Sequence, residues 1–221
     1  MTSVTKRLAG VITTAAVVVI LIALYIGLYL TNASASVSAT QGSGGAQLTL
    51  ATVAAAALND SHPTWVSYYA VSPDLKTWKH ATTYDLPAHT LVHVTIYQFD
   101  SQTGLRNEFL GQATGVTGGK FLLNGKSTSA IDPTTASHVF AIQAFNLSVP
   151  LYGIPSSAKN PCSNAPCSMS NDHETIQFSF TTPGPGLYRW QCYVPCAAGF
   201  IEGFGGPMQT VGYMDGFIKV V

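Results

Sequence analysis

Apolar and polar residues alternate along several short segments of this chain, and turn-forming residues separate these segments. The alternation is clearest over residues 91–99 and again over 175–180. Strict alternation is typical of a β-strand with one buried face, because successive side chains point to opposite sides of the strand. Residues 48–53 fit a strand or a short helix equally well. The other segments expected to be strands are apolar or aromatic: 64–71, 136–147, 186–192 and 216–221.

Helical periodicity does not extend beyond a turn or two anywhere after residue 30. Residues 31–46 are rich in Ser, Gly, Ala and Thr and are interpreted as a flexible tether. Two stretches, 104–133 and 150–172, are interpreted as long excursions between strands, the first with one hairpin. Many short strands with Gly and Pro turns predict an all-β sandwich or barrel over 47–221.

An uncharged apolar run occupies residues 8–30, directly after Lys6 and Arg7. As a helix at ~1.5 Å per residue it would be roughly 35 Å long, enough to cross a bilayer. A cleavable signal has a shorter apolar core of about 7–15 residues, although the sequence at 33–35 is similar to a cleavage site. The run therefore favours one uncleaved transmembrane helix in the cell membrane. The two cations place residues 1–7 in the cytoplasm and the C-terminal domain outside it.

Charge and motifs exclude several classes of function. Ten Lys and Arg residues balance ten Asp and Glu residues among 221, so the chain has no basic field for a nucleic-acid partner. The nucleophile elbow of hydrolases, the paired-histidine motif of zinc proteases and the phosphate-binding glycine loop are all missing from the sequence. The carboxylates are few and scattered, so no acid–base pair can be nominated. The chain is not expected to be an enzyme by itself.

The four cysteines form two pairs with different contexts. Cys192 and Cys196 follow a predicted strand, and thiolates at a strand end favour a metal site because the sheet fixes the ligand directions. The same spacing also permits a disulfide, since a turn brings the two Cα atoms within ~4.4–6.8 Å. The sequence leaves both possibilities open. Cys162 and Cys167 lie in the second excursion and are predicted to form a disulfide in an oxidising compartment.

The residues around His138 and over 186–196 resemble the cupredoxin domain of cytochrome c oxidase subunit II, and a similar domain of nitrous oxide reductase. In that family a histidine opens one strand, and the motif Gly-x-Tyr-x-x-x-Cys-x-x-x-Cys closes another, as both do here. The likeness covers roughly 86–99 and 136–221. It implies a Greek-key β-sandwich, a single N-terminal anchor and a copper site that transfers electrons.

The ligand loop departs from the family pattern after Cys196. The family has a second histidine four residues further on and a methionine three beyond it, where this chain has Phe200 and Gly203. The family's binuclear copper centre is therefore not expected. An imidazole, two thiolates and a thioether nevertheless suit copper, Cu(I) especially. The soft donors that remain are His138, Cys192, Cys196 and either Met208 or Met214. Met208 is the thioether candidate, whereas Met214 is interpreted as a packing residue. His173 is the candidate for a second imidazole.

These observations lead to one hypothesis and two alternatives. The hypothesis is a membrane-anchored, extracytoplasmic cupredoxin-like protein that binds copper and transfers electrons in a respiratory-type chain, with oxidase subunits or a redox protein as partner. Phe200 motivates the first alternative, a metal-free structural or accessory subunit held by disulfides. The second alternative is copper delivery, for which the same soft ligands are suitable.

Overall fold

The structure is a computed structural model that describes residues 3–25, 36–60, 62–196 and 206–221. The chain divides into two units, Met1–Ser34 and Ala35–Val221. The described residues of the first unit form the helix α1, at Ser3–Tyr25.

Helix α1 overlaps the transmembrane helix predicted over 8–30, whose last five residues lie outside the described part of the chain. Among the described residues, no helix combines the length and the apolar character needed to cross a membrane. The prediction of a transmembrane helix is therefore not supported by the structure.

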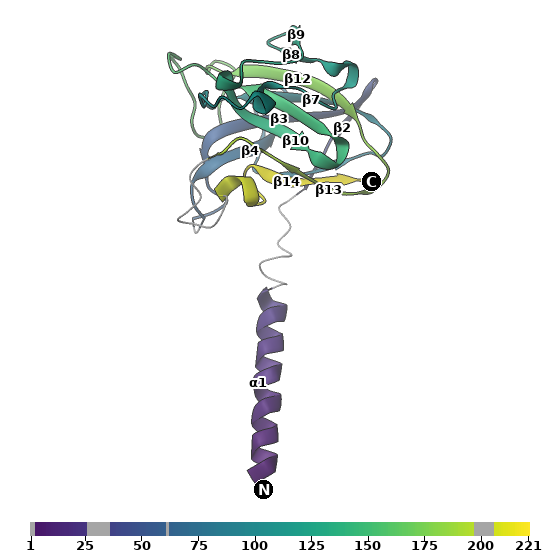
Figure 1. Ribbon diagram of the computed structural model, residues 1–221, viewed down its shortest axis with the longest axis vertical. Helices are drawn as coiled ribbons and strands as arrows, with labels where there is room; N and C mark the ends of the chain where they lie inside the picture. Colours follow the sequence, from purple (N-terminus) through teal and green to yellow (C-terminus); the bar gives the residue numbers. More distant parts are fainter. Residues whose placement is uncertain (1–2, 26–35, 61, 197–205) are drawn as a thin grey trace. The chain divides into compact units, whose positions relative to one another are not determined.

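The second unit consists of two β-sheets that share a core (Figure 1). Buried apolar side chains of both sheets pack together, for example Leu50 and Ile96 from one sheet and Phe140 and Ile218 from the other. This confirms the prediction of an all-β sandwich. One sheet has six strands in the order β1 (Ser36–Ser38), β6 (Thr83–Leu86), β14 (Asp215–Val220), β13 (Gly186–Gln191), β10 (Ala136–Ile142) and β11 (Leu147–Tyr152). The other has eight, in the order β5 (Trp78–Lys79), β4 (Trp65–Val71), β3 (Gly45–Ala56), β7 (Leu91–Gln98), β12 (Glu174–Thr181), β8 (Phe121–Leu123) and β9 (Lys126–Thr128), with β2 (Thr40–Gly42) paired to β3.

The segment 136–147 is not the single strand that the sequence predicts. Strand β10 ends at Ile142, the short helix η5 (Gln143–Phe145) follows, and the chain returns as β11. Asn146 sits at the turn with a φ of 52°, a left-handed conformation that asparagine tolerates better than most residues. Both strands are buried along nearly their whole length, so the apolar run gave no sign of the break.

The prediction of a flexible tether over 31–46 is wrong for residues 36–46, the part of that range that the structure describes. Strand β1 pairs in parallel with β6, and β2 pairs antiparallel with β3. Both strands lie at sheet margins with mostly exposed side chains, so their polar composition is similar to that of a linker. The excursion 104–133 contains the expected hairpin, β8–β9.

Gly216 is held against the neighbouring strand so closely that no side chain fits. A Cβ atom at this position would lie 1.8 Å from the carbonyl oxygen of Thr82. The same oxygen accepts the indole N–H of Trp190 at 2.8 Å, so the backbone has little room to move. We expect Gly216→Ala to lower the free energy of unfolding by ~1–3 kcal/mol, measured by urea denaturation.

The control for this prediction is Gly184→Ala. Its Cβ atom would meet only the ring of His89, at 3.7 Å, which is ordinary van der Waals contact. We expect its free energy of unfolding to stay within about 0.5 kcal/mol of the parent protein. Equal stability of the two variants would contradict the close packing of β14.

Candidate metal centre

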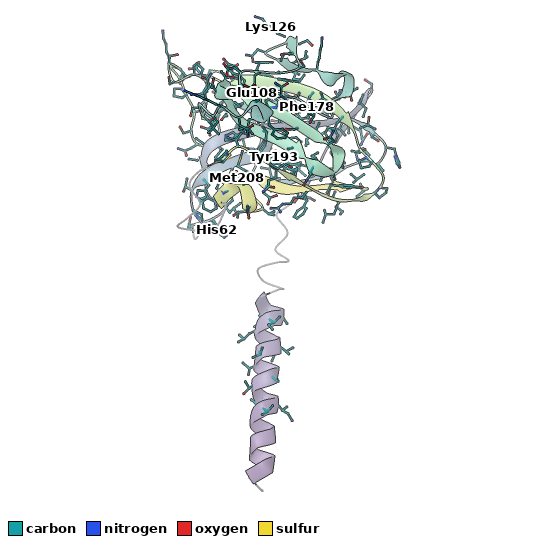
Figure 2. The ribbon with its side chains drawn as sticks, viewed as in Figure 1. His62, Glu108, Lys126, Phe178, Tyr193 and Met208 are labelled. Atoms are coloured by element: carbon teal, nitrogen blue, oxygen red, sulfur yellow. A yellow bond between two sulfur atoms is a disulfide. The ribbon has the colours of Figure 1, made fainter. Side chains whose placement is uncertain are left out.

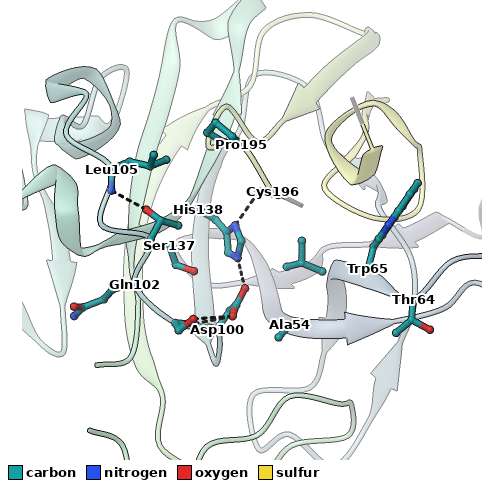
Figure 3. Close-up of a pocket in the computed structure, with 13 residues that line it drawn as sticks. Ala54, Thr64, Trp65, Asp100, Gln102, Leu105, Ser137, His138, Pro195 and Cys196 are labelled. Carbon is teal, nitrogen blue, oxygen red and sulfur yellow. Dashed lines mark hydrogen bonds and ion pairs between the residues drawn. The ribbon is translucent and has the colours of Figure 1, made fainter. Parts of the chain in front are cut away.

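One imidazole and two thiol groups meet at one buried place in the domain, in the side chains of His138, Cys192 and Cys196. Figure 3 shows His138 and Cys196 of this group. The Nδ1 atom of His138 lies 3.1 Å from Sγ of Cys196 and 4.0 Å from Sγ of Cys192. The two sulfur atoms are 3.4 Å apart and form no disulfide. All three side chains are buried, with exposures of 1–4%. The structure thus brings together the three residues that the sequence identified as candidate ligands, although His138 lies more than fifty positions before the two cysteines.

Strand pairing explains why these residues meet. Ala141 of β10 is the antiparallel partner of Gln191 of β13, so His138, earlier on β10, lies beside the segment that follows β13. The backbone N–H of Val139 donates to Sγ of Cys192 at 3.4 Å. The backbone N–H of Cys192 in turn donates to the carbonyl oxygen of Met214 at 2.9 Å. Cys192 is therefore fixed by neighbours on both sides.

Met208 is the methionine that lies at the centre. It belongs to the short helix η6 (Gly206–Gln209), on the six-stranded-sheet side of the domain (Figure 2). Its Sδ atom accepts the backbone N–H of Cys196 at 3.4 Å, and the side-chain amide of Gln191 donates to its carbonyl oxygen. Met214 is fully buried in the core and its N–H donates to Pro207, which agrees with the packing role expected for it.

Asp100 is a residue of the centre that sequence reasoning missed. Its Oδ2 atom lies 3.0 Å from Nε2 of His138, on the side of the ring that faces away from the sulfur atoms (Figure 3). Asp100 follows the end of β7, in the other sheet, and its side chain is 20% exposed. The sequence offered one signal, an acidic residue directly after the clearest alternating strand.

The two thiols of the centre have pKa values shifted in opposite directions. Burial lowers the pKa of His138, but its bonds to Asp100 and Cys192 outweigh burial and raise the pKa to about 9. Burial raises the pKa of Cys192, but hydrogen bonds with Cys196 and His138 outweigh it and lower this pKa below its ordinary value. Burial and the charge on Cys192 raise the pKa of Cys196.

These shifts define the protonation of the metal-free centre at neutral pH. Cys196 is the sulfur nearer to Nδ1, but burial and the neighbouring Cys192 keep its pKa raised, whereas Cys192 accepts the backbone N–H of Val139 and its pKa is lowered, so the negative charge lies on Cys192. Burial raises the pKa of Asp100, but the hydrogen bond and charge of His138, together with the hydrogen bonds from Ser101, outweigh burial and lower this pKa below its ordinary value. The centre therefore holds an imidazolium between a carboxylate and a thiolate, with one thiol still protonated.

A cavity of about 500 Å³ adjoins the centre. His138 and Cys196 form part of its wall, together with Asp100, Ser137, Gln102 and Trp65. The hydroxyl of Ser137 is buried and has no hydrogen-bond partner among the described residues. Two of the three donor side chains, those of His138 and Cys196, therefore border a cavity.

The other candidate residues lie apart from this cluster. Cys162 and Cys167 form the predicted disulfide, with an S–S distance of 2.08 Å. Nδ1 of His173 donates to the carbonyl oxygen of Asn171 at 2.7 Å, and its ring packs against Tyr97 and Phe99. His173 is not part of the cluster of donor atoms found among the described residues.

The donor set fits copper. One ligand atom from each of His138, Cys192 and Cys196 lies within 4.8 Å of the others, so a single ion can contact all three. Two thiolates, one imidazole and a neighbouring thioether are the soft ligands that copper prefers. Phe200 and Gly203, the two positions at which the sequence departs from the ligand pattern that it resembles, lie outside the described residues.

Comparisons with known proteins return weak structural likenesses. No protein-family model and no curated protein matches the chain. A structure of the copper protein rusticyanin has 17% identity and a TM-score of 0.32, covering 84% of this chain and 82% of the other. Rusticyanin from Thiobacillus ferrooxidans has 15% identity, the same coverage and a TM-score of 0.34. A chain of a heme-copper terminal oxidase dimer has 12% identity and a TM-score of 0.33 over the whole of both chains. Such low TM-scores support no conclusion, so copper is inferred here from the donor atoms of this chain.

Proposed function

We propose that this protein is an extracytoplasmic, cupredoxin-like copper protein that transfers electrons in a respiratory-type redox chain. His138 would supply the imidazole ligand, Cys192 and Cys196 the thiolates, and Met208 the thioether. The observation that carries the proposal is the convergence of three soft donor atoms within 4.8 Å in a buried site. Copper bound there would supply one-electron chemistry by cycling between Cu(I) and Cu(II).

The surroundings of the donors suit electron transfer. His138 lies on a fully buried strand, and Cys192 receives a backbone N–H from the same strand. Ligands held by a rigid sheet change position little between oxidation states, because their rotamers are locked by packing. A respiratory oxidase subunit or a soluble redox protein is the proposed partner.

The test is copper loading of the purified full-length chain. We expect about one copper per chain and an intense visible absorption from thiolate-to-copper charge transfer. The Cys162→Ser/Cys167→Ser variant, which keeps the centre and removes the disulfide, is the matched control and should show the same absorption. A protein that takes up no stoichiometric copper would rule the proposal out.

A thiol count separates the proposal from the metal-free alternative. The structure has two free thiols, at Cys192 and Cys196, and one disulfide. We expect unreduced, denatured protein to react with two equivalents of a thiol reagent. A count of zero would favour an accessory subunit held by two disulfides. Copper delivery would be recognised by loss of the ion when its oxidation state is cycled.

His138 and Cys196 are expected to release about two protons together when copper binds near pH 7. The pKa of His138 is raised to about 9 and that of Cys196 is raised as well, so both carry a proton that the metal displaces. Cys192 has a lowered pKa and contributes none. The apparent copper affinity should therefore keep rising as the pH increases to about 9. Titration calorimetry in buffers with different ionisation enthalpies measures the release, and a value of zero would contradict these protonation states.

The location of the protein is also part of the proposal. The disulfide supports an oxidising compartment outside the cytoplasm, since disulfides rarely persist in the cytosol. The uncharged run over 8–30 supports attachment to the cell membrane, although the described residues contain no spanning helix. Recovery of the full-length chain in the soluble fraction after cell lysis would contradict attachment.

A further inference from the structure

We propose that Asp100 is a positioning residue of the centre, whose carboxylate holds the ring of His138 with Nδ1 facing the two sulfur atoms. This inference rests on the proposed function and deepens it, because it names the group that prepares the imidazole for the metal. Nothing in the ligand pattern of the sequence points to Asp100.

The two ring nitrogens of His138 have different neighbours. Nδ1 faces the sulfurs, with 3.1 Å to Cys196, and Nε2 faces Asp100, with 3.0 Å to its Oδ2 atom. An ionised carboxylate only accepts hydrogen bonds, so it keeps a proton on Nε2. Nδ1 is then the nitrogen whose proton a metal displaces, and a metal-ligating histidine is commonly oriented by such an outer partner.

Asp100 is itself held in place. Its Oδ1 atom accepts the backbone N–H of Ser101 at 2.7 Å, and its own N–H donates to the side-chain oxygen of Gln98 at 3.2 Å. Its carbonyl oxygen accepts the N–H of Ile154 at 3.0 Å. With one carboxylate oxygen engaged by the backbone, the other is directed at the imidazole.

The contact also joins the two sheets at the centre. Asp100 extends from the end of β7, a strand of the eight-stranded sheet, whereas His138 lies on β10 of the six-stranded sheet. Of the described residues that line the adjoining cavity, Asp100 alone has a carboxylate side chain. No second carboxylate in that wall can replace Asp100.

Asp100→Ala and Asp100→Asn test the role, with Asp74→Ala as the matched control. Asp74 also accepts a backbone N–H, from Lys76 at 3.2 Å, and a hydroxyl, from Ser72 at 2.6 Å, in a turn between β4 and β5. Asn at position 100 keeps the size of the side chain and one oxygen that can accept the Nε2 proton. This variant covers the case in which Asp100→Ala does not fold.

The first measurement uses metal-free, full-length protein and does not depend on copper. We expect the Nε2 proton of His138 to be protected from exchange with water in ¹H–¹⁵N spectra of the parent protein and of Asp74→Ala. It should be unprotected in Asp100→Ala and partly protected in Asp100→Asn. Equal protection in all four proteins would overturn the proposal.

The second measurement is copper affinity with the visible spectrum of the loaded protein. Loss of an outer partner typically costs ~10–100-fold in metal affinity, so we expect that decrease for Asp100→Ala, partial rescue by Asn and no change for Asp74→Ala. Unchanged affinity and spectrum in Asp100→Ala would overturn the positioning role. If the parent protein binds no copper while protection of the Nε2 proton still depends on Asp100, the proposed function fails and the role of Asp100 in orienting His138 stands.

Discussion

The Cys192→Ser variant, loaded with copper, is expected to lose its thiolate-to-copper absorption and to bind the ion more than about 100-fold less tightly. Loss of an outer partner alone costs ~10–100-fold, and loss of a ligand removes a direct bond to the metal. A serine hydroxyl is also a harder donor than a thiolate and stays protonated at neutral pH. Equilibrium dialysis against a copper chelator and the visible spectrum measure both effects.

The Cys196→Ser variant provides the comparison within the same centre. Cys192 is fixed by the N–H of Val139 and by the strand before it, whereas Cys196 lies four residues further along the chain, in a loop. We therefore expect Cys196→Ser to lower the affinity less than Cys192→Ser does. Wild-type absorption in the Cys192→Ser variant would exclude this thiolate as a ligand.

The Trp190→Ala variant is expected to lose ~3–5 kcal/mol of unfolding free energy, the range for truncation of a large buried aromatic side chain. The indole is fully buried and packs against Tyr68 and Phe140, with ring centroids 4.7 and 5.2 Å away. Its N–H donates to the carbonyl oxygen of Thr82. Truncation leaves a cavity in the core and removes one hydrogen bond to the carbonyl oxygen of Thr82, which still accepts the backbone N–H of Phe217 at 3.0 Å.

Urea denaturation measures this loss, with Leu187→Ala as the control on the same strand. Leu187 is 63% exposed, so its truncation should change the free energy of unfolding by no more than about 0.5 kcal/mol. Because Trp190 lies two residues before Cys192, we also expect weaker copper binding in Trp190→Ala. A similar stability for both variants would contradict the packing of Trp190 at the centre of the sandwich.

Local features of the sequence determined the class of fold and the types of donor atom. The alternation at β7 and β12 identified half-buried strands because the period of two is a property of the strand itself. The short spacing of Cys162 and Cys167 was sufficient to predict their disulfide, since few residues separate them along the chain. Cys192 and Cys196 also lie close together along the chain, so their spacing was sufficient to identify them as a pair of soft donors.

The tertiary structure decided what depends on contacts between distant segments. Strands β1 and β2 have polar residues at sheet margins, and only pairing with β6 and β3 distinguishes them from a linker. The break between β10 and β11 lies inside a continuous apolar run, because both strands are buried.

The centre shows the same division between local and long-range information. The sequence determined that one imidazole and two thiols were available, at His138, Cys192 and Cys196. Whether the thiols would be free, and which group would orient the imidazole, depended on the register between β10 and β13 and on the approach of Asp100 from the other sheet. No local pattern encodes that approach, because thirty-seven residues separate Asp100 and His138 along the chain and the packing of the two sheets brings them to 3.0 Å.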